Sequence, residues 1–291
     1  MKLLLIIVIL AACTTYSLMD GNVIKNWNYQ LQGYDEAFVE RVARSENTMW
    51  IIDRDFESNK PFSTFDILKM KNKNSNTLIS YMSIGEAEDY RPYFAKIPKE
   101  LIAKENPHWK GNFDIFFWEE AWHQILYKSD NSYLDTILAV GFQGVYLDIV
   151  DGYKRFPDKK DAAEQMAKLI QGISAKAKAL NPDFRIYLQN GSEIINDLPP
   201  DFQKDFLKAV DGLSIEGYFF DYSKDKPVVS DWFKNLEPVY RYYKAQDKDV
   251  FMIEYVEDQM LQKTVIDYCN KNEIKLLITD RLLKGTFSIN N

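Results

Sequence analysis

The sequence has few of the residues on which many catalytic chemistries depend. It contains two cysteines and two histidines, and neither His108 nor His123 lies at the end of a predicted strand. A Ser-His-Asp or Cys-His arrangement needs a histidine to carry the proton, and a histidine-rich zinc centre needs several. Acyl-transfer chemistry is therefore disfavoured and such a zinc centre is excluded. A calcium or magnesium site built from acids alone stays open.

Basic residues and nucleotide-binding motifs are also scarce. The chain has 36 Lys and Arg against 43 Asp and Glu, which gives a formal charge of −7 at pH 7. A nucleic-acid binder is expected to show a basic excess or patch. No Gly-x-Gly-x-x-Gly follows the first predicted strand, and no Gly-Lys-Ser/Thr phosphate loop occurs. We therefore expect no nucleic-acid partner, no nucleotide chemistry and no cofactor.

An apolar run occurs at the amino terminus, where Met1-Lys2 precedes ten apolar residues and Cys13. Ten residues span about 15 Å as a helix, about half of the ~30 Å hydrocarbon core, so the run is typical of an export signal. Leu10-Ala11-Ala12-Cys13 resembles the bacterial lipoprotein box, in which the signal is cut before a cysteine that carries lipid. We predict a signal peptide over residues 1–12, a short tether over 13–25, and lipid anchoring through Cys13 in the cell envelope, facing the periplasm or the exterior.

Short apolar runs alternate with longer amphipathic stretches along the rest of the chain, which is typical of βα units. One helical stretch is Asp161–Leu180. The predicted strands number eight: Trp27–Gln32, Met49–Asp53, Thr77–Ser83, Gly144–Asp148, Arg185–Asn190, Gly212–Glu216, Val250–Tyr255 and Lys275–Asp280. The pattern predicts an α/β fold, a single (β/α)₈ TIM barrel over residues 26–291.

Polar residues stand at or just after the end of nearly every predicted strand, where barrel enzymes carry their chemistry. Any single acid there also suits a turn or a helix cap. Acids that converge on one opening repel each other, which raises the pKa of some of them. A pair of such carboxylates is the minimal equipment for breaking a glycosidic bond, since one protonates the leaving oxygen and the other acts at the anomeric carbon.

Several stretches together resemble one family, the endo-α-1,4-polygalactosaminidase-like glycoside hydrolases (glycoside hydrolase family 114). The matching stretches are Trp27–Gly33, Ile51–Asp53, Tyr81–Arg91, Gly141–Asp151, Gln189–Gly191 and Ile215–Tyr218. The resemblance implies that Asp148 and Glu216 are the catalytic pair. By analogy with other barrel glycosidases, Asp148 is expected to be the nucleophile and Glu216 the acid/base, whereas retention or inversion stays open.

The resemblance also implies a polysaccharide partner, in particular a cationic amino-sugar polymer cleaved inside the chain. The predicted substrate-binding residues are Asp53, Glu86, Tyr90, Arg91, Trp118, Asp151, Gln189, Asn190, Tyr218, Glu254 and Asp280. For each aromatic residue in this set a role in the core stays equally open. The alternative hypothesis is a non-catalytic glycan-binding lipoprotein on the same barrel.

Overall fold

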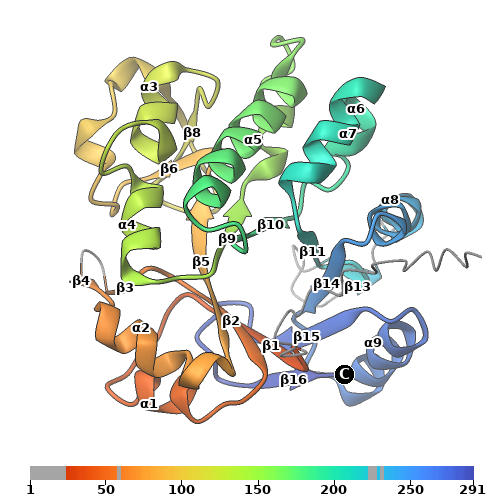
Figure 1. The fold of residues 1–291 in the computed structure, drawn as a ribbon. Coiled ribbons are helices and arrows are strands. Elements are labelled where there is room, and N and C mark those ends of the chain that lie inside the picture. Colours follow the sequence, from red (N-terminus) through yellow and green to blue (C-terminus); the bar gives the residue numbers. More distant parts are fainter. Residues whose placement is uncertain (1–23, 58–59, 222–227, 230–232) are drawn as a thin grey trace, which may run out of the picture.

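The computed structural model describes residues 24–57, 60–221, 228–229 and 233–291. The predicted signal peptide and Cys13 lie outside these residues. The main sheet has the order β1-β2-β5-β9-β10-β11-β14-β15-β16, in which the first eight strands are parallel (Figure 1). Its strands are β1 (Asn26–Gln30), β2 (Thr48–Ile52), β5 (Thr77–Ser83), β9 (Gly144–Asp148), β10 (Arg185–Gln189), β11 (Gly212–Glu216), β14 (Asp249–Glu254), β15 (Lys275–Thr279) and β16 (Ser288–Asn290).

The sheet curves into a nearly closed barrel. The strand β16 pairs antiparallel with β15 and was not predicted from the sequence. The last gap, between this pair and β1, is bridged by hydrogen bonds. Leu31 and Gln32 donate backbone N–H groups to the carbonyl of Leu283 at 2.9 and 3.1 Å, and Trp27 N–H donates to the Asn290 side chain at 2.9 Å. The eight parallel strands confirm the predicted TIM barrel, and their ends lie within two residues of the predicted ones.

Side chains alternate between the two faces of each strand, as the pleat requires. One face fills the barrel interior with a cluster rich in aromatic rings, which includes Tyr29, Tyr81, Tyr146 and Tyr187. The other face packs against the surrounding helices in a second, larger cluster. In β9, for example, Tyr146 points inward whereas Val145 and Leu147 belong to the outer cluster. This alternation decides which strand-end residues reach the mouth of the barrel.

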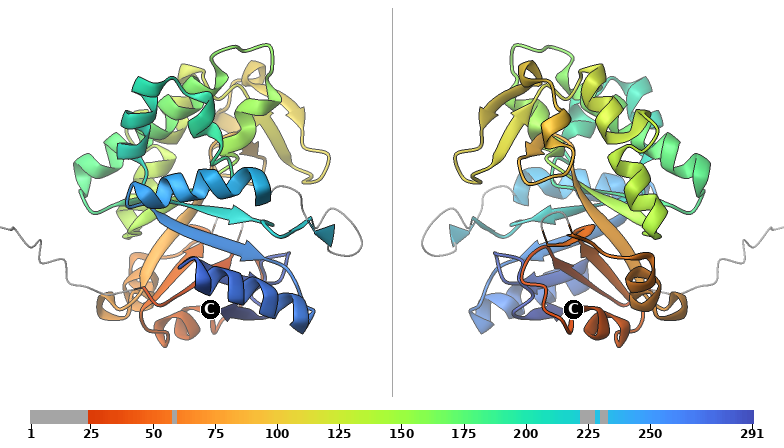
Figure 2. Two further views of the ribbon diagram at one scale, coloured as in Figure 1. Left: turned by 90° about the vertical axis from the view of Figure 1, so that its right-hand side faces the viewer. Right: turned by 90° about the vertical axis from the view of Figure 1, so that its left-hand side faces the viewer.

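Helices surround the strands (Figures 1 and 2). The helix α5 (Ala162–Leu180) agrees with the stretch Asp161–Leu180 predicted from the sequence. Two helices begin at capping boxes, in which Ser63 accepts a hydrogen bond from Asp66 N–H and Ser132 accepts one from Asp135 N–H. The α-helices are α1 (Phe38–Ala43), α2 (Thr64–Met70), α3 (Glu120–His123), α4 (Tyr133–Val140), α5 (Ala162–Leu180), α6 (Ile194–Asp197), α7 (Pro200–Ala209), α8 (Phe233–Ala245) and α9 (Gln259–Lys271). Across the described residues, no helix combines the length and apolar composition needed to cross a bilayer.

The long segment between β5 and β9 forms a small antiparallel sheet of its own, in the order β6-β8-β7. Figure 2 shows it projecting from the barrel. Its strands are β6 (Glu86–Glu88), β7 (Ile102–Glu105) and β8 (Asn112–Ile115). Two short hairpins, β3 (Asp55–Glu57) with β4 (Lys60–Pro61) and β12 (Phe220–Asp221) with β13 (Val228–Val229), follow β2 and β11. Additions after strands β2, β5 and β11 all extend the same end of the barrel, where they enlarge its mouth.

Candidate active site

A cavity of about 680 Å³ opens at the carboxyl ends of the barrel strands. Its wall contains interior-facing side chains from the ends of β9, β10 and β11, together with residues of the β6-β8-β7 sheet. The structure brings together most of the residues that the sequence singled out. Of the predicted site residues, those that line the cavity are Asp53, Glu86, Tyr90, Arg91, Asp148, Asp151, Gln189, Asn190 and Glu216.

Asp148 is the last residue of β9 and has the same inward parity as Tyr146. Its carboxylate accepts two hydrogen bonds, one from Tyr81 Oη at 2.7 Å and one from the backbone N–H of Ile149 at 2.7 Å. Ile149 itself adopts the left-handed backbone conformation, with φ of 59°, which is rare and strained for a β-branched residue. Gly85 makes room for this turn, since a Cβ atom there would lie 2.3 Å from the carbonyl oxygen of Ile149. The carboxylate is thus held from two sides.

Burial raises the pKa of Asp148 to about 8, and the hydrogen bonds from Tyr81 and Ile149 oppose this shift. The negative charges of Glu216 and Asp151 add to the increase. No ion pair joins Asp148 to a basic residue of the described chain. A carboxyl group in this state holds its proton at neutral pH, and a positive charge brought close to it would release that proton.

Glu216 ends β11, two strands away from Asp148 around the barrel. Two strand spacings separate their backbones by roughly 10 Å, and Gln189 of β10 lies on the strand between them. Glu216 Oε2 accepts hydrogen bonds from the side-chain amides of Gln189 and Asn190 at 3.3 and 3.1 Å. Glu216 Oε1 accepts one from the hydroxyl of Tyr255. The two acids therefore face one cavity from different strands, each with fixed donors.

Three tyrosines complete this arrangement, and sequence reasoning missed all of them. Tyr81 donates to Asp148, Tyr255 donates to Glu216, and Tyr29 donates to Gln189 Oε1 at 2.9 Å. Burial raises the pKa of each hydroxyl well above its usual value, so these groups remain donors. The only available signal was their inward parity in strands that end at the site, and an interior tyrosine of a barrel reads equally well as core.

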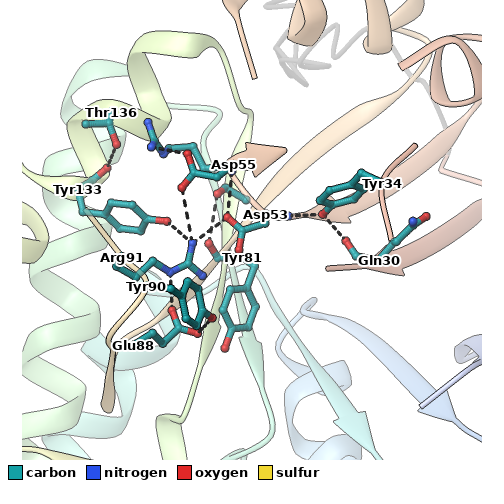
Figure 3. Close-up of polar contacts among 12 residues, drawn as sticks. Gln30, Tyr34, Asp53, Asp55, Tyr81, Glu88, Tyr90, Arg91, Tyr133 and Thr136 are labelled. Carbon is teal, nitrogen blue, oxygen red and sulfur yellow. Dashed lines mark hydrogen bonds and ion pairs between the residues drawn. The ribbon is translucent and has the colours of Figure 1, made fainter. Parts of the chain in front are cut away.

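A buried guanidinium connects the β6-β8-β7 sheet to the end of β2 (Figure 3). Arg91 donates to Asp53 at 2.8 Å and to Glu88 at 2.5 Å, and also to the hydroxyl of Tyr133 at 2.9 Å. The side chains of Arg91 and Glu88 are each 2 % exposed, so each charge is stabilised by its partner and not by water. Tyr90 Oη donates to the second oxygen of Glu88 at 2.5 Å. The network neutralises two cavity acids and fixes one wall of the cavity.

Asp151 differs from the other acids of the cavity wall. It stands in the 3₁₀ helix Val150–Arg155 that follows β9. Its carboxylate forms no hydrogen bond or ion pair with another residue of the described ranges, whereas Glu86 is paired with Arg155 and Asp53 with Arg91. Burial raises the pKa of Asp151, and the positive charges of Arg155 and Lys154 oppose this shift. The cavity thus contains a carboxylate that is available to a ligand.

Four residues predicted to bind substrate do not line the cavity, and the parity of the strands explains two of them. Glu254 shares the outward face of β14 with Met252, is fully buried, and accepts a hydrogen bond from Phe219 N–H at 2.8 Å. Asp280 follows the inward-facing Thr279 and instead accepts backbone bonds from Lys284 and Thr286, both at 2.9 Å.

The other two corrections concern aromatic residues. Tyr218 is fully buried, and its ring packs against Tyr240 and Tyr268. Trp118 packs edge-on against Phe156 at 5.0 Å, beside a smaller hollow. Both residues serve packing, which was the open alternative for each aromatic. The tryptophan that does line the main cavity is Trp109. For the metal alternative, no group of three or more His, Cys, Asp or Glu side chains suited to an ion occurs within the described ranges.

Comparisons with known proteins agree with this geometry. The model of glycoside-hydrolase family GH114 matches residues 11–290. A protein of Methanocaldococcus jannaschii is 34% identical over 276 residues, covering 89% of this chain and 75% of its own length, and one of Deinococcus radiodurans is 30% identical over 251 residues, covering 84% and 77%. Both relatives are described as uncharacterised.

Two similar solved structures share the fold. Ega3 of Aspergillus fumigatus, in complex with galactosamine, superposes with a TM-score of 0.70 at 17% identity and covers 92% of this chain and 96% of its own. The glycoside hydrolase domain of PelA from Pseudomonas aeruginosa gives 0.69 at 11% identity, with 91% and 98% covered. Because the family model spans nearly the whole sequence, the protein belongs to glycoside-hydrolase family GH114.

Proposed function

We propose that the protein is an endo-acting glycosidase that cleaves α-linked, galactosamine-type polysaccharide, with Asp148 and Glu216 as the catalytic pair. The observation that carries the proposal is the shared cavity, in which the two acids face inward from β9 and β11. Membership of the family supports hydrolysis of a glycosidic bond. The complex of Ega3 with galactosamine supports the choice of sugar.

In the proposed mechanism Glu216 protonates the glycosidic oxygen while the carboxylate of Asp148 attacks the anomeric carbon. The bond to the leaving sugar breaks and a glycosyl ester of Asp148 forms. Water then attacks the same carbon, gives its proton to Glu216 and releases Asp148. Tyr81 and the N–H of Ile149 orient the attacking oxygens, and Gln189, Asn190 and Tyr255 orient Glu216. Donors fixed in this way reduce the reorganisation needed in the transition state.

The test uses Asp148→Asn and Glu216→Gln, each of which keeps the shape of the side chain. We expect both variants to fold and to lose hydrolysis of an α-1,4-linked galactosamine polymer by at least about a thousandfold, because each removes a group that acts on the reacting bond. Asp183→Asn and Glu257→Gln, at exposed positions outside the cavity wall, are the matched controls and should retain activity.

Two further results would contradict the proposal. Full activity in both catalytic variants would exclude the pair. Wild-type protein that binds the polymer but releases no product would support the non-catalytic glycan-binding function instead. The anomer formed first, followed by NMR, tests the roles, because a nucleophilic Asp148 predicts retention of the α configuration.

We also propose that Asp151 selects the amino sugar through its ammonium group. An unpaired, largely desolvated carboxylate gains more from a bound cation than one already paired with arginine. Asp151→Asn is therefore expected to lose roughly tenfold or more in kcat/KM on a galactosamine polymer, and much less on its N-acetylated counterpart. Equal losses on both polymers would reject this role, with Asp183→Asn again as the control.

The localisation proposal rests on the sequence alone. We propose that residues 1–12 are removed and that lipid on Cys13 anchors the protein in the cell envelope, which would hold the enzyme near a surface polysaccharide. Mass spectrometry of the mature amino terminus tests this directly. A Cys13→Ser variant should move from the membrane fraction to the soluble fraction, and an unchanged distribution would reject the anchor.

A further inference from the structure

Large apolar side chains that stay exposed are unevenly distributed over the described surface. Three of them line the main cavity, namely Tyr90, Trp109 and Leu282, with exposed fractions of 42 %, 52 % and 52 %. Trp109 stands in the turn between β7 and β8, at the lip of the cavity (strands shown in Figure 2). Among the tryptophans that the structure describes, Trp27 and Trp122 are fully buried and Trp50 and Trp118 pack against the core. Of these five described tryptophans, Trp109 alone has its ring held in solvent.

Backbone hydrogen bonds hold the turn that carries Trp109. The carbonyl of Trp109 accepts a hydrogen bond from Asn112 N–H at 3.1 Å, and Asn106 N–H donates to the carbonyl of Asn112 at 2.7 Å. Gly111 has φ of 87°, and a Cβ atom there would lie 2.7 Å from the carboxylate of Asp89. The same Gly111 accepts a bond from Asp89 N–H at 2.8 Å, which connects the turn to the segment after β6. The indole is therefore presented from a fixed backbone.

The indole itself has no hydrogen bond and no aromatic neighbour within the described ranges. Exposing a ring of this size to water costs free energy that burial elsewhere would avoid. The other cavity aromatic, Tyr90, is held by Glu88 through its hydroxyl and by Arg91 over its ring at 5.0 Å. Trp109 thus combines a hydrogen-bonded backbone, an open ring face and a place on the cavity wall.

We propose that Trp109 is the stacking platform of a distal sugar subsite, which takes a pyranose ring of the polymer beyond the residues bound at the catalytic pair. A galactosamine ring has one apolar face, formed by the C–H groups at C3, C4 and C5, that matches an indole face. Indole N–H is also free to donate to a hydroxyl group of the sugar. This inference rests on the proposed function and extends it from the reacting bond to the binding of a long chain.

The platform predicts a dependence on chain length. A polymer reaches from the acids to the lip, whereas a short oligosaccharide fills the catalytic part alone. Trp109→Ala should therefore lose at least about ten times more kcat/KM on a long galactosamine polymer than on a tri- or tetrasaccharide, with the loss in KM. Trp109→Phe, which keeps an aromatic face, should recover most of it. Phe65→Ala removes an aromatic ring that is 72 % exposed on α2, outside the cavity wall, and should retain the activity on both substrates.

A binding measurement separates this inference from the proposed function. In the Glu216→Gln background, Trp109→Ala should weaken binding of the polymer at least tenfold in calorimetry. If the wild-type protein hydrolyses the polymer but Trp109→Ala loses equally on long and short substrates, the platform is overturned and the proposed function stays intact. Suppose that Trp109→Ala weakens binding of the polymer but the wild-type protein never hydrolyses it. That result would keep the platform and overturn the proposed hydrolase function. Absence of both binding and hydrolysis would overturn both.

Discussion

The carboxyl of Asp148 must be desolvated to be positioned, and the same desolvation favours its protonated form. Burial raises its pKa to about 8, with Glu216 and Asp151 as further contributions. A nucleophile must be ionised, so the free protein holds Asp148 in an inactive state below this pH. A bound amino sugar favours the ionised form of Asp148, because its ammonium group lowers the pKa of a neighbouring acid. Substrate charge and nucleophile charge are therefore coupled.

The first prediction concerns the pH profile of the wild-type enzyme. If Asp148 is the nucleophile, the acid limb of the kcat/KM profile should rise about tenfold per pH unit, because only the ionised fraction of Asp148 can attack. The profile of kcat should be displaced to lower pH, because the bound cationic substrate lowers the pKa in the complex. Initial rates over pH 5–9.5 measure both. A kcat/KM that does not rise with pH on the acid side would contradict Asp148 as a nucleophile that must be ionised.

The second prediction concerns stability at the same residue. The pKa of Asp148 is about 8 in the folded protein, against an ordinary 3.8, so the folded state retains a proton that the unfolded state releases between these values. The free energy of unfolding contributed by this group therefore falls as pH rises from about 4 to 8. Asp148→Asn avoids that loss. Its gain in stability over wild type should increase by roughly 3–4 kcal/mol between pH 5 and pH 8, at about 1.4 kcal/mol per pH unit. Urea unfolding measures it, and a pH-independent difference would contradict the shifted pKa.

The segment from β6 to β8 is joined to the barrel by charge, through Arg91 and its two acid partners Asp53 and Glu88. Buried pairs of this kind contribute little when intact but are costly to break, because one charge is left without a partner. For function, the network fixes the position of this segment relative to the barrel. Both Tyr90 and the turn that presents Trp109 belong to this segment, so the same guanidinium that neutralises acids also sets one wall of the cavity.

The third prediction follows from this network. Arg91→Ala should lower the free energy of unfolding by about 3–5 kcal/mol, since Asp53 and Glu88 lose their cation. Arg41→Ala removes a comparable ion pair with Asp35 at 2.9 Å, but those side chains are 47 % and 61 % exposed, so the loss there should stay within about 1 kcal/mol. Chemical denaturation of both variants measures the contrast. Similar losses in the two proteins would show that burial does not decide the strength of this connection.

The molecule as a whole has a charge of −7, with carboxylates gathered at the cavity. Such a field attracts a polycation and weakens as salt screens it. The fourth prediction is that kcat/KM on galactosamine polymer falls several-fold between about 50 and 500 mM NaCl, whereas kcat at saturation changes little. An N-acetylated polymer is the matched uncharged control. Equal salt dependence on both polymers would reject electrostatic attraction of the substrate.

The architecture could be predicted from sequence because buried parallel strands leave a clear pattern of apolar runs after helix-ending signals. The ends of β9 and β11 followed from that pattern, whereas the choice of Asp148 and Glu216 among the polar residues at strand ends came from the resemblance to the family. Other features depend on the pairing of distant segments, which no local pattern encodes. Neither the antiparallel β16 nor the β6-β8-β7 sheet was expected, and the latter supplies the Arg91 network and Trp109.

The errors within the site have one physical cause. A strand end presents neighbouring side chains to opposite faces, and the sequence did not show which of two adjacent residues points inward. Glu254 was therefore chosen in place of Tyr255, and Asp280 was chosen although it follows an inward-facing threonine. Both residues were chosen because they are acids, whereas the parity of the strand decides which side chains face the cavity. Interior tyrosines escaped notice because a phenol ring serves equally well as filler and as hydrogen-bond donor.

Ile149 is an obvious target for substitutions meant to make this protein more heat-tolerant. Its backbone is left-handed, and glycine or asparagine adopts such a torsion with less strain. The replacement would relax the main chain at the point where its amide aligns the attacking carboxylate. Directed evolution that selects only for survival of heating should accept this change, and selection for turnover should refuse it.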